Sequence, residues 1–189
     1  MSLKVEKTPL AGLLVLTPDS FSDDRGYLAE TYHLERYREA GIDCEFVQDN
    51  QSFSRRNVLR GLHAQLKKPQ AKLARVLFGE IFDVAVDARP GSPTFGKWHG
   101  VTLSGENLRQ LFIPEGFLHG FCVMSESALV HYKCSDLYDP SESFGIKWDD
   151  PDLAVKWPIQ APILSNKDNQ NMSWAEARPL LEKAKAKKS

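Results

Sequence analysis

The chain has 189 residues, 42% of them hydrophobic, which is enough to bury one core and predicts a single domain over residues 1–189. Its 24 basic and 25 acidic side chains give a formal net charge of −1, which argues against nucleic acid and anionic membranes as partners. Three scattered cysteines, Cys44, Cys122 and Cys134, lack the spacing of a disulfide framework or a thiolate zinc site. The early apolar run 10–16 ends at Thr17-Pro18, too soon for a membrane span, so we expect a cytoplasmic protein.

Short apolar segments separated by Gly, Pro, Asp and Ser dominate the chain, which is typical of an all-β protein. In chain order, the expected strands cover residues 10–16, 73–78, 81–86, 98–103, 108–113, 117–124 and 128–134. The Gly79-Glu80 pair predicts a hairpin between the second and third of them. One early helix is expected over residues 34–40, closed by Gly41. A capping box from Ser173 to Glu176 predicts a helical tail over about residues 173–189, limited or kinked by Pro179.

Neighbouring strands without long crossovers predict a double-sheet antiparallel jelly-roll barrel with a few short helices and room for a small ligand inside. Period-two alternation places Phe117, His119, Phe121 and Val123 on one face of a strand. The same alternation groups Tyr132 with Ala128, Val130 and Cys134, and it directs the Tyr132 phenol inward if that face lines the barrel.

The segment 57–65 is the richest in chemistry, because it brings Arg60 and His63 close to Lys72. Such a group places a proton acceptor beside two cations and suits an anionic ligand. Arg60 and His63 have opposite strand parity, so only a β-bulge at Gly61 would direct both side chains into one pocket.

Four residues are candidates for proton-transfer chemistry, and each has a structural alternative. His63 is a candidate general base, Lys72 a cation that stabilises an enolate, Tyr132 a proton donor, and Asp168 a carboxylate that orients an imidazole. Taken alone, such residues are more often a core histidine, a strand-edge lysine, a packing tyrosine and a turn aspartate. The five histidines form no His-x-His pair, and no carboxylate lies at ligand spacing from His63, so we predict no metal site.

Separate motifs along the chain resemble one known family. They are Asp24-Arg-Gly-Tyr-Leu-Ala-Glu30, Gln48-Asp-Asn50, Val58-Leu-Arg-Gly-Leu-His63, Gln70-Ala-Lys-Leu73, Val84-Ala-Val-Asp-Ala-Arg89, Ser92-Pro-Thr-Phe-Gly96, Ile113-Pro-Glu-Gly-Phe-Leu-His-Gly-Phe121, Tyr132-Lys-Cys134 and Gly145-Ile-Lys-Trp-Asp-Asp-Pro151. They resemble the dTDP-4-dehydrorhamnose 3,5-epimerases, which have the cupin fold, and the match runs from about residue 10 to residue 168, nearly the whole chain.

The resemblance implies an isomerase that inverts C-3 and C-5 of dTDP-4-dehydro-6-deoxy-D-glucose in dTDP-L-rhamnose biosynthesis. It implies that His63 is the base, assisted by Asp168, that Tyr132 is the acid, and that Lys72 stabilises the enolate. The implied substrate-binding residues are Arg25, Glu30, Gln48, Asn50, Arg60, His119 and Lys167. It also implies a homodimer with exchanged N-terminal strands and no cofactor; Arg25 and Glu30 would then reach the nucleotide of the neighbouring subunit.

Three departures from the family pattern leave the substrate open. Ala64 replaces the usual aromatic residue after the histidine, Ser143 stands where the family has glutamate, with Glu142 one position early, and the usual proline after Asp168 is missing. The alternatives are therefore a single-position 3- or 5-epimerase on a related nucleotide-linked 4-keto sugar, and a non-catalytic cupin that binds sugar nucleotides.

Overall fold

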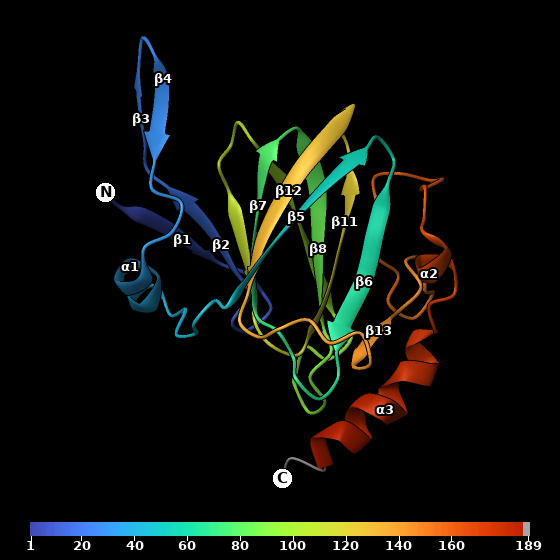
Figure 1. Cartoon of the computed structure of the whole chain (residues 1–189). Helices are drawn as coiled ribbons and strands as arrows, with labels where there is room; N and C mark the ends of the chain where they lie inside the picture. The colour runs from blue at the N-terminus through green and yellow to red at the C-terminus, as the bar shows by residue number, and fades with distance from the viewer. Residues whose placement is uncertain (187–189) are drawn as a thin grey trace.

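The computed structural model describes residues 1–186, in which two antiparallel sheets face each other around a common core (Figure 1). The larger sheet has the order β1 (Leu3–Lys7), β2 (Leu14–Pro18), β10 (Gln110–Ile113), β7 (Lys72–Phe78), β12 (Ser127–Cys134) and β5 (Gln48–Arg55). The smaller sheet has the order β13 (Ser143–Gly145), β6 (Leu59–Gln65), β11 (Phe117–Val123), β8 (Glu80–Asp87) and β9 (Trp98–Ser104). This arrangement confirms the predicted all-β double-sheet fold.

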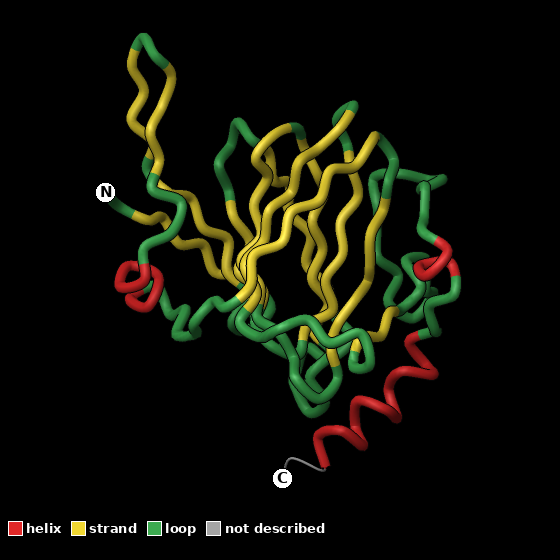
Figure 2. The backbone as a smooth tube through the Cα atoms, in the orientation of Figure 1, coloured by secondary structure: helices red, strands yellow, loops and turns green. Residues whose placement is uncertain are grey.

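The remaining elements lie outside the two sheets (Figure 2). They are the hairpin of β3 (Ser20–Asp23) and β4 (Gly26–Ala29) and the helices α1 (Leu34–Glu39), α2 (Asn166–Asn169) and α3 (Trp174–Ala186). The hairpin projects away from the barrel, whereas α3 packs through Trp174, Ala177 and Leu181 against the outer face of the smaller sheet. No helix in the described part of the chain combines the length and apolar character needed to cross a membrane.

The alternation expected in two central strands is present. Phe117, Phe121 and Val123 of β11 pack in the core between the sheets together with Ala128 and Val130 of β12. Tyr132 packs against the same cluster, so its ring lies inside the barrel. Burying these side chains contributes roughly 1.5–3 kcal/mol each, and this fixes which face of each strand points inward.

The predicted hairpin at Gly79-Glu80 is wrong. Strand β7 pairs with β10 and β12, whereas β8 pairs with β9 and β11, so the chain crosses from one sheet to the other at this point. Gly79 has a φ of +79°, and a Cβ atom there would lie 2.0 Å from the carbonyl oxygen of Ser127. Glycine is therefore required because the backbone passes against the start of β12, not because it closes a hairpin.

Both predicted helices are present. Helix α1 is followed by Gly41 with a φ of +90°, and Ser173 and Glu176 form the expected reciprocal capping hydrogen bonds before α3. Helix α3 continues through Pro179 to Ala186, so the proline does not end it. The last three residues of the predicted tail, 187–189, lie outside the described residues. Strands β1, β3, β4, β5 and β13 were not predicted.

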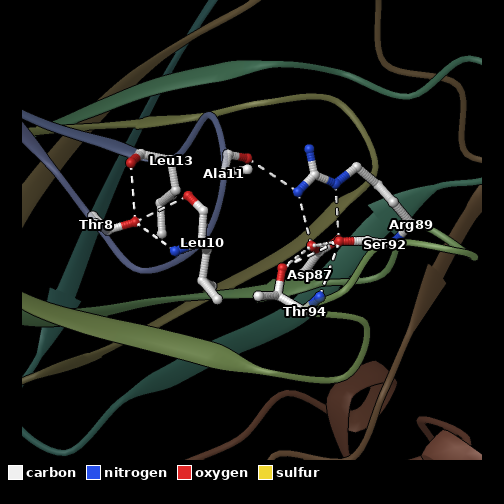
Figure 3. A network of polar contacts seen from close by, with 8 residues as sticks. All are labelled: Thr8, Leu10, Ala11, Leu13, Asp87, Arg89, Ser92 and Thr94. Atoms are coloured by element: carbon white, nitrogen blue, oxygen red, sulfur yellow. Dashed lines mark hydrogen bonds and ion pairs between the residues drawn. The ribbon is translucent and has the colours of Figure 1, made fainter.

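A polar network fixes the turn between β1 and β2 to the segment after β8 (Figure 3). The buried carboxylate of Asp87 accepts hydrogen bonds from Arg89, Ser92 and Thr94, at 2.6 to 2.8 Å from their side-chain atoms. Arg89 also donates to the carbonyl of Ala11 at 3.0 Å. Burial raises the pKa of Asp87, but the hydrogen bonds outweigh it and lower that pKa to about 2.

Candidate functional site

A cavity of about 400 Å³ opens between the two sheets. It is lined by residues from both sheets and from the loop that carries α2, namely Gln48, Asn50, Ser52, Arg60, His63, Ala64, Gln65, Gln70, Lys72, His119, Gly120, Phe121, Tyr132, Tyr138, Ser143, Ser165, Lys167 and Asp168. The four residues predicted to act in proton transfer all line this cavity, namely His63, Lys72, Tyr132 and Asp168. A cavity of this size with several polar groups is typical of a small-molecule site.

The predicted bulge at Gly61 brings Arg60 and His63 into this cavity. The pairing of β6 with β11 changes register between His63 and Arg60, so that both side chains line the same pocket despite their opposite parity. Gly61 has a φ of +117°, and a Cβ atom there would lie 2.5 Å from the Cα of Gly120. Only glycine permits this close approach of the two strands.

His63 and Asp168 form a hydrogen-bonded pair between β6 and α2. Asp168 Oδ1 contacts Nε2 of His63, and Asp168 Oδ2 accepts a hydrogen bond from the Ser165 hydroxyl at 2.8 Å. Burial raises the pKa of Asp168, but its hydrogen bonds with His63 and Ser165 outweigh burial and lower that pKa. An ionised Asp168 requires Nε2 to be the donor, so in the neutral imidazole Nδ1 is the nitrogen that can accept a proton.

Asp168 is also a turn residue, as the structural alternative to a catalytic role predicted. Its backbone N–H donates to the Ser165 hydroxyl, 3.1 Å away, at the beginning of α2. Ser165 thus holds both the backbone and the carboxylate of Asp168. The two interpretations of Asp168 are compatible, because the cap fixes the carboxylate that contacts the imidazole.

Lys72 and Tyr132 lie together on adjacent strands of the larger sheet. The Lys72 ammonium is 5.9 Å from the centre of the Tyr132 ring. Burial lowers the pKa of Lys72, opposed by nearby Cys134 and Asp83. Burial raises the pKa of the Tyr132 phenol, with a smaller contribution from Cys134 in the same direction and an opposing one from Arg60. Tyr132 is therefore a protonated phenol at neutral pH, which is the state a proton donor needs.

A second histidine–carboxylate pair was missed by the sequence analysis. His119 Nε2 lies 2.7 Å from Oδ1 of Asp83, and the side chain of Asp83 is completely buried. The ring centre of His119 lies 6.4 Å from that of Tyr132. Asp83 Oδ2 has no hydrogen-bond partner among the described residues. The available signal was an aspartate in the middle of the apolar strand segment 81–86, where an unpaired charge is costly.

Polar side chains from several elements form the rest of the cavity wall. Arg60 donates to the Ser54 hydroxyl at 2.9 Å, and Gln48 donates to Asn50 at 3.1 Å. Lys167 donates to the Ser143 hydroxyl at 3.2 Å from the other side. Two cations and two amides are thus available for a polar or anionic ligand.

Two predicted binding residues lie outside the cavity of their own chain. Arg25 is in the β3–β4 hairpin, with 89% of its side chain exposed, and pairs with Asp23 at 2.6 Å. Glu30 follows the hairpin and pairs with Arg36 at 2.6 Å. Within one chain, neither residue is among those that line the cavity.

Two of the three departures noted in the sequence lie in the cavity wall. Ala64 and Ser143 both line the cavity, and both have short side chains. Glu142 is absent from the lining and pairs with Lys67 at 2.5 Å instead. The wall beside β13 therefore carries a hydroxyl and the Lys167 ammonium but no free carboxylate.

Comparison with known proteins identifies the family of the chain. A family model described as dTDP-4-dehydrorhamnose 3,5-epimerase matches residues 7–176. A dTDP-4-dehydrorhamnose 3,5-epimerase from Methanothermobacter thermautotrophicus is 52% identical over 165 residues, which cover 86% of this chain and 89% of that protein. The crystal structure of the 3,5-epimerase from Legionella pneumophila with dTDP-4-keto-L-rhamnose is 48% identical, with a TM-score of 0.88 over 90% of this chain and 92% of that one.

A relative that inverts a single position has the same fold. The 3'-monoepimerase from Streptomyces bikiniensis, solved with dTDP-quinovose, is 33% identical, with a TM-score of 0.87 over 96% of this chain and 95% of that one. These matches confirm the predicted resemblance and the isomerase class. The chain belongs to the dTDP-4-dehydrorhamnose 3,5-epimerase family.

Proposed function

We propose that this protein inverts C-3 and C-5 of dTDP-4-dehydro-6-deoxy-D-glucose to give dTDP-4-dehydro-L-rhamnose, a step of dTDP-L-rhamnose biosynthesis. One observation carries the proposal: a carboxylate-paired imidazole, a buried protonated phenol and an ammonium line the same cavity. Removing a proton from a carbon beside a ketone requires a base and a cation that stabilises the enolate. Returning a proton requires an acid, so the three groups meet the needs of the reaction.

The base acts on carbon atoms next to the C-4 carbonyl. The ketone acidifies the protons on C-3 and C-5, because the charge left behind moves onto the C-4 oxygen. Nδ1 of His63 takes each proton in turn, while Asp168 stabilises the imidazolium that forms. The Lys72 ammonium stabilises the enolate oxygen, and its low-dielectric surroundings make that interaction stronger than it would be in water.

The acid returns a proton to the opposite face of the sugar ring. Tyr132 projects from β12 of the larger sheet, whereas His63 projects from β6 of the smaller one. A substrate held between the sheets meets the two groups from different sides, and reprotonation by Tyr132 then inverts the carbon. The raised pKa of the phenol keeps its proton available until the enolate forms.

The remaining polar residues bind the nucleotide diphosphate and the sugar. The planar guanidinium of Arg60 suits a diphosphate, and His119 and Lys167 line the same cavity. Gln48 and Asn50 offer amide groups to the sugar and its linkage. Arg25 and Glu30 contact the nucleotide of a second subunit, because Arg25 lies on the projecting arm, Glu30 follows it directly, and both are outside their own cavity.

We propose further that residues 1–189 form one cytoplasmic epimerase domain that works as a homodimer with exchanged N-terminal strands. The β3–β4 hairpin supports this assembly, because Phe21, Tyr27 and Leu28 are 53%, 59% and 65% exposed on an arm that projects from the barrel. Exposed apolar groups of this kind mark interaction surfaces.

Isotope exchange tests the function directly. The purified protein, incubated with dTDP-4-dehydro-6-deoxy-D-glucose in deuterated water, is expected to place deuterium on both C-3 and C-5 of the product. His63→Ala should lower the exchange rate ~10³-fold, and Tyr132→Phe should lower product formation ~10²-fold, because each removes a proton-transfer group. Undiminished turnover in either variant contradicts the assigned roles.

Matched controls and a second outcome complete the test. His99→Ala and Tyr32→Phe remove the same groups from sites outside the cavity lining and should keep near-normal rates. Deuterium on one carbon alone would instead indicate a single-position epimerase. Ala64 and Ser143 motivate this second candidate, because both line the cavity at positions where the chain departs from the family pattern.

A further inference from the structure

Asn171 is a buried polar residue in the segment between α2 and α3. Its side chain is 7% exposed, and its amide nitrogen lies 3.5 Å from the carbonyl oxygen of Gly61 and 3.4 Å from that of Ile146. Gly61 is the bulge residue of β6, two positions before His63, and Ile146 follows β13. The amide therefore connects the Asp168 segment with β6, which carries His63, and with the end of β13, which pairs with β6.

The position of the amide is tightly restricted. Gly145, which pairs with His63 across β13 and β6, has no side chain, and a Cβ atom there would lie 2.2 Å from Oδ1 of Asn171. The backbone N–H of Asn171 donates to the carbonyl of Asp168 at 3.3 Å, and Met172 donates to Gly145 at 3.2 Å. A side chain held on every side in this way has one low-energy position.

The amide also acts on the Asp168 carboxylate. Burial raises the pKa of Asp168, and hydrogen bonding by His63, then Ser165, then Asn171 lowers it. The Asn171 NH₂ group thus favours the ionised carboxylate, the form that accepts from Nε2 of His63. Asn171 thus connects the bulge, the residue after β13 and Asp168 through one side chain.

We propose that Asn171 is a positioning residue, whose buried amide fixes Asp168 relative to the Gly61 bulge and thereby keeps His63 in the orientation and tautomer that removes the substrate proton. The inference rests on the proposed function of His63 and Asp168. It goes further in one respect: the epimerase reaction of this chain also requires the NH₂ group of Asn171 as a hydrogen-bond donor.

Two substitutions separate positioning from packing. Asn171→Ala removes the amide, and Asn171→Asp keeps its shape but replaces the donor with a carboxyl group facing Asp168. Both variants should lower kcat ~10- to 100-fold with little change in KM, since small misplacement of a catalytic group has costs of this size. Asn107→Ala is the matched control, because Asn107 also bonds to backbone groups, but to those of Ser104 and Thr102, which lie outside the cavity lining.

Proton NMR detects the hydrogen bond between His63 and Asp168 without a measurement of turnover. The proton between His63 and Asp168 gives a downfield resonance, which His63→Ala identifies by its loss. That resonance should shift or disappear in both Asn171 variants and stay unchanged in Asn107→Ala. Wild-type kcat in Asn171→Asp together with an unchanged resonance overturns the inference, whereas full exchange by His63→Ala would overturn the proposed function instead.

Discussion

At the scale of single residues, the geometry of the site depends on Gly61. A Cβ at position 61 would lie 2.5 Å from Gly120 Cα and 2.6 Å from the carbonyl oxygen of His119. Gly61→Ala should therefore separate β6 from β11, lower the melting temperature and reduce kcat at least ~10²-fold, because His63 moves relative to the other strand. Thermal unfolding and steady-state kinetics measure both effects.

Gly41→Ala is a suitable control for that substitution. Gly41 also has a positive φ, +90°, but a Cβ atom there would meet nothing within 4 Å. It should therefore show the backbone strain of a left-handed residue, about 1–2 kcal/mol, and keep normal kcat. Equal kinetic losses in the two variants would mean that contact with β11 is not what positions His63.

The candidate site was partly predictable at this scale. Histidine, lysine and tyrosine suggested proton transfer through their chemistry. Strand alternation directed Tyr132 inward if its face lined the barrel, and a bulge at Gly61 was the condition for Arg60 and His63 to share a pocket. The contacts of Asp83 and Asn171 were not predictable, since their partners are 36 and 110 residues away in the sequence. Such contacts depend on how strands are ordered in the sheets, and that order leaves no local pattern.

At the scale of elements, the Asp87 network joins the β1–β2 turn to the end of β8. The folded-state pKa of Asp87, about 2, lies below its ordinary value of 3.8. Its ionised form therefore stabilises the fold by about 2 kcal/mol above the ordinary pKa, and this contribution is lost as the pH falls from about 3.8 to about 2.

Asp87→Asn should remove this pH dependence. At pH 7 the variant should be about 3 kcal/mol less stable, because Arg89 loses its buried partner. Urea unfolding at pH 7, 4 and 3 should show the difference between the two proteins narrowing toward low pH. Parallel curves would exclude Asp87 as the titrating group. Asp19→Asn, at an exposed carboxylate bonded to the Ser2 backbone, should change stability little.

Elements with alternating apolar residues were predicted well, and polar ones were missed. Strand β12 alternates buried and partly exposed positions, which the sequence displays directly. Strand β5 has the sequence QDNQSFSR with one fully buried residue, Ser54, and it forms because β12 offers a free edge. Gly79 was misread because a turn glycine looks the same in a hairpin and in a crossing between sheets.

At the scale of the whole molecule, the β3–β4 arm has few partners within its own chain. An isolated two-stranded hairpin is at best marginally stable in water, and this one carries three exposed large apolar side chains. Its Arg25 lies outside the cavity of its own chain. A second copy that receives the arm would cover the apolar groups and bring Arg25 to the neighbouring cavity.

Mixing two variants, each impaired at a different residue of the site, tests this arrangement. Arg25→Ala should raise KM because the nucleotide loses a contact, and His63→Ala should abolish exchange in its own barrel. In a mixed dimer, the barrel that keeps His63 receives its arm from the chain that keeps Arg25, so one complete site returns. After subunit exchange at equal amounts, random pairing should restore about a quarter of the wild-type rate at low substrate.

The pairing of variants makes the result specific. If each cavity used the Arg25 of its own chain, no combination of these two proteins could assemble a complete site, and the mixture would show only the average of its components. Arg25→Ala combined with a chain carrying both substitutions should likewise gain nothing, since neither chain then supplies the arginine. Recovery in the first mixture and none in the second requires that the arm of one subunit completes the site of the other.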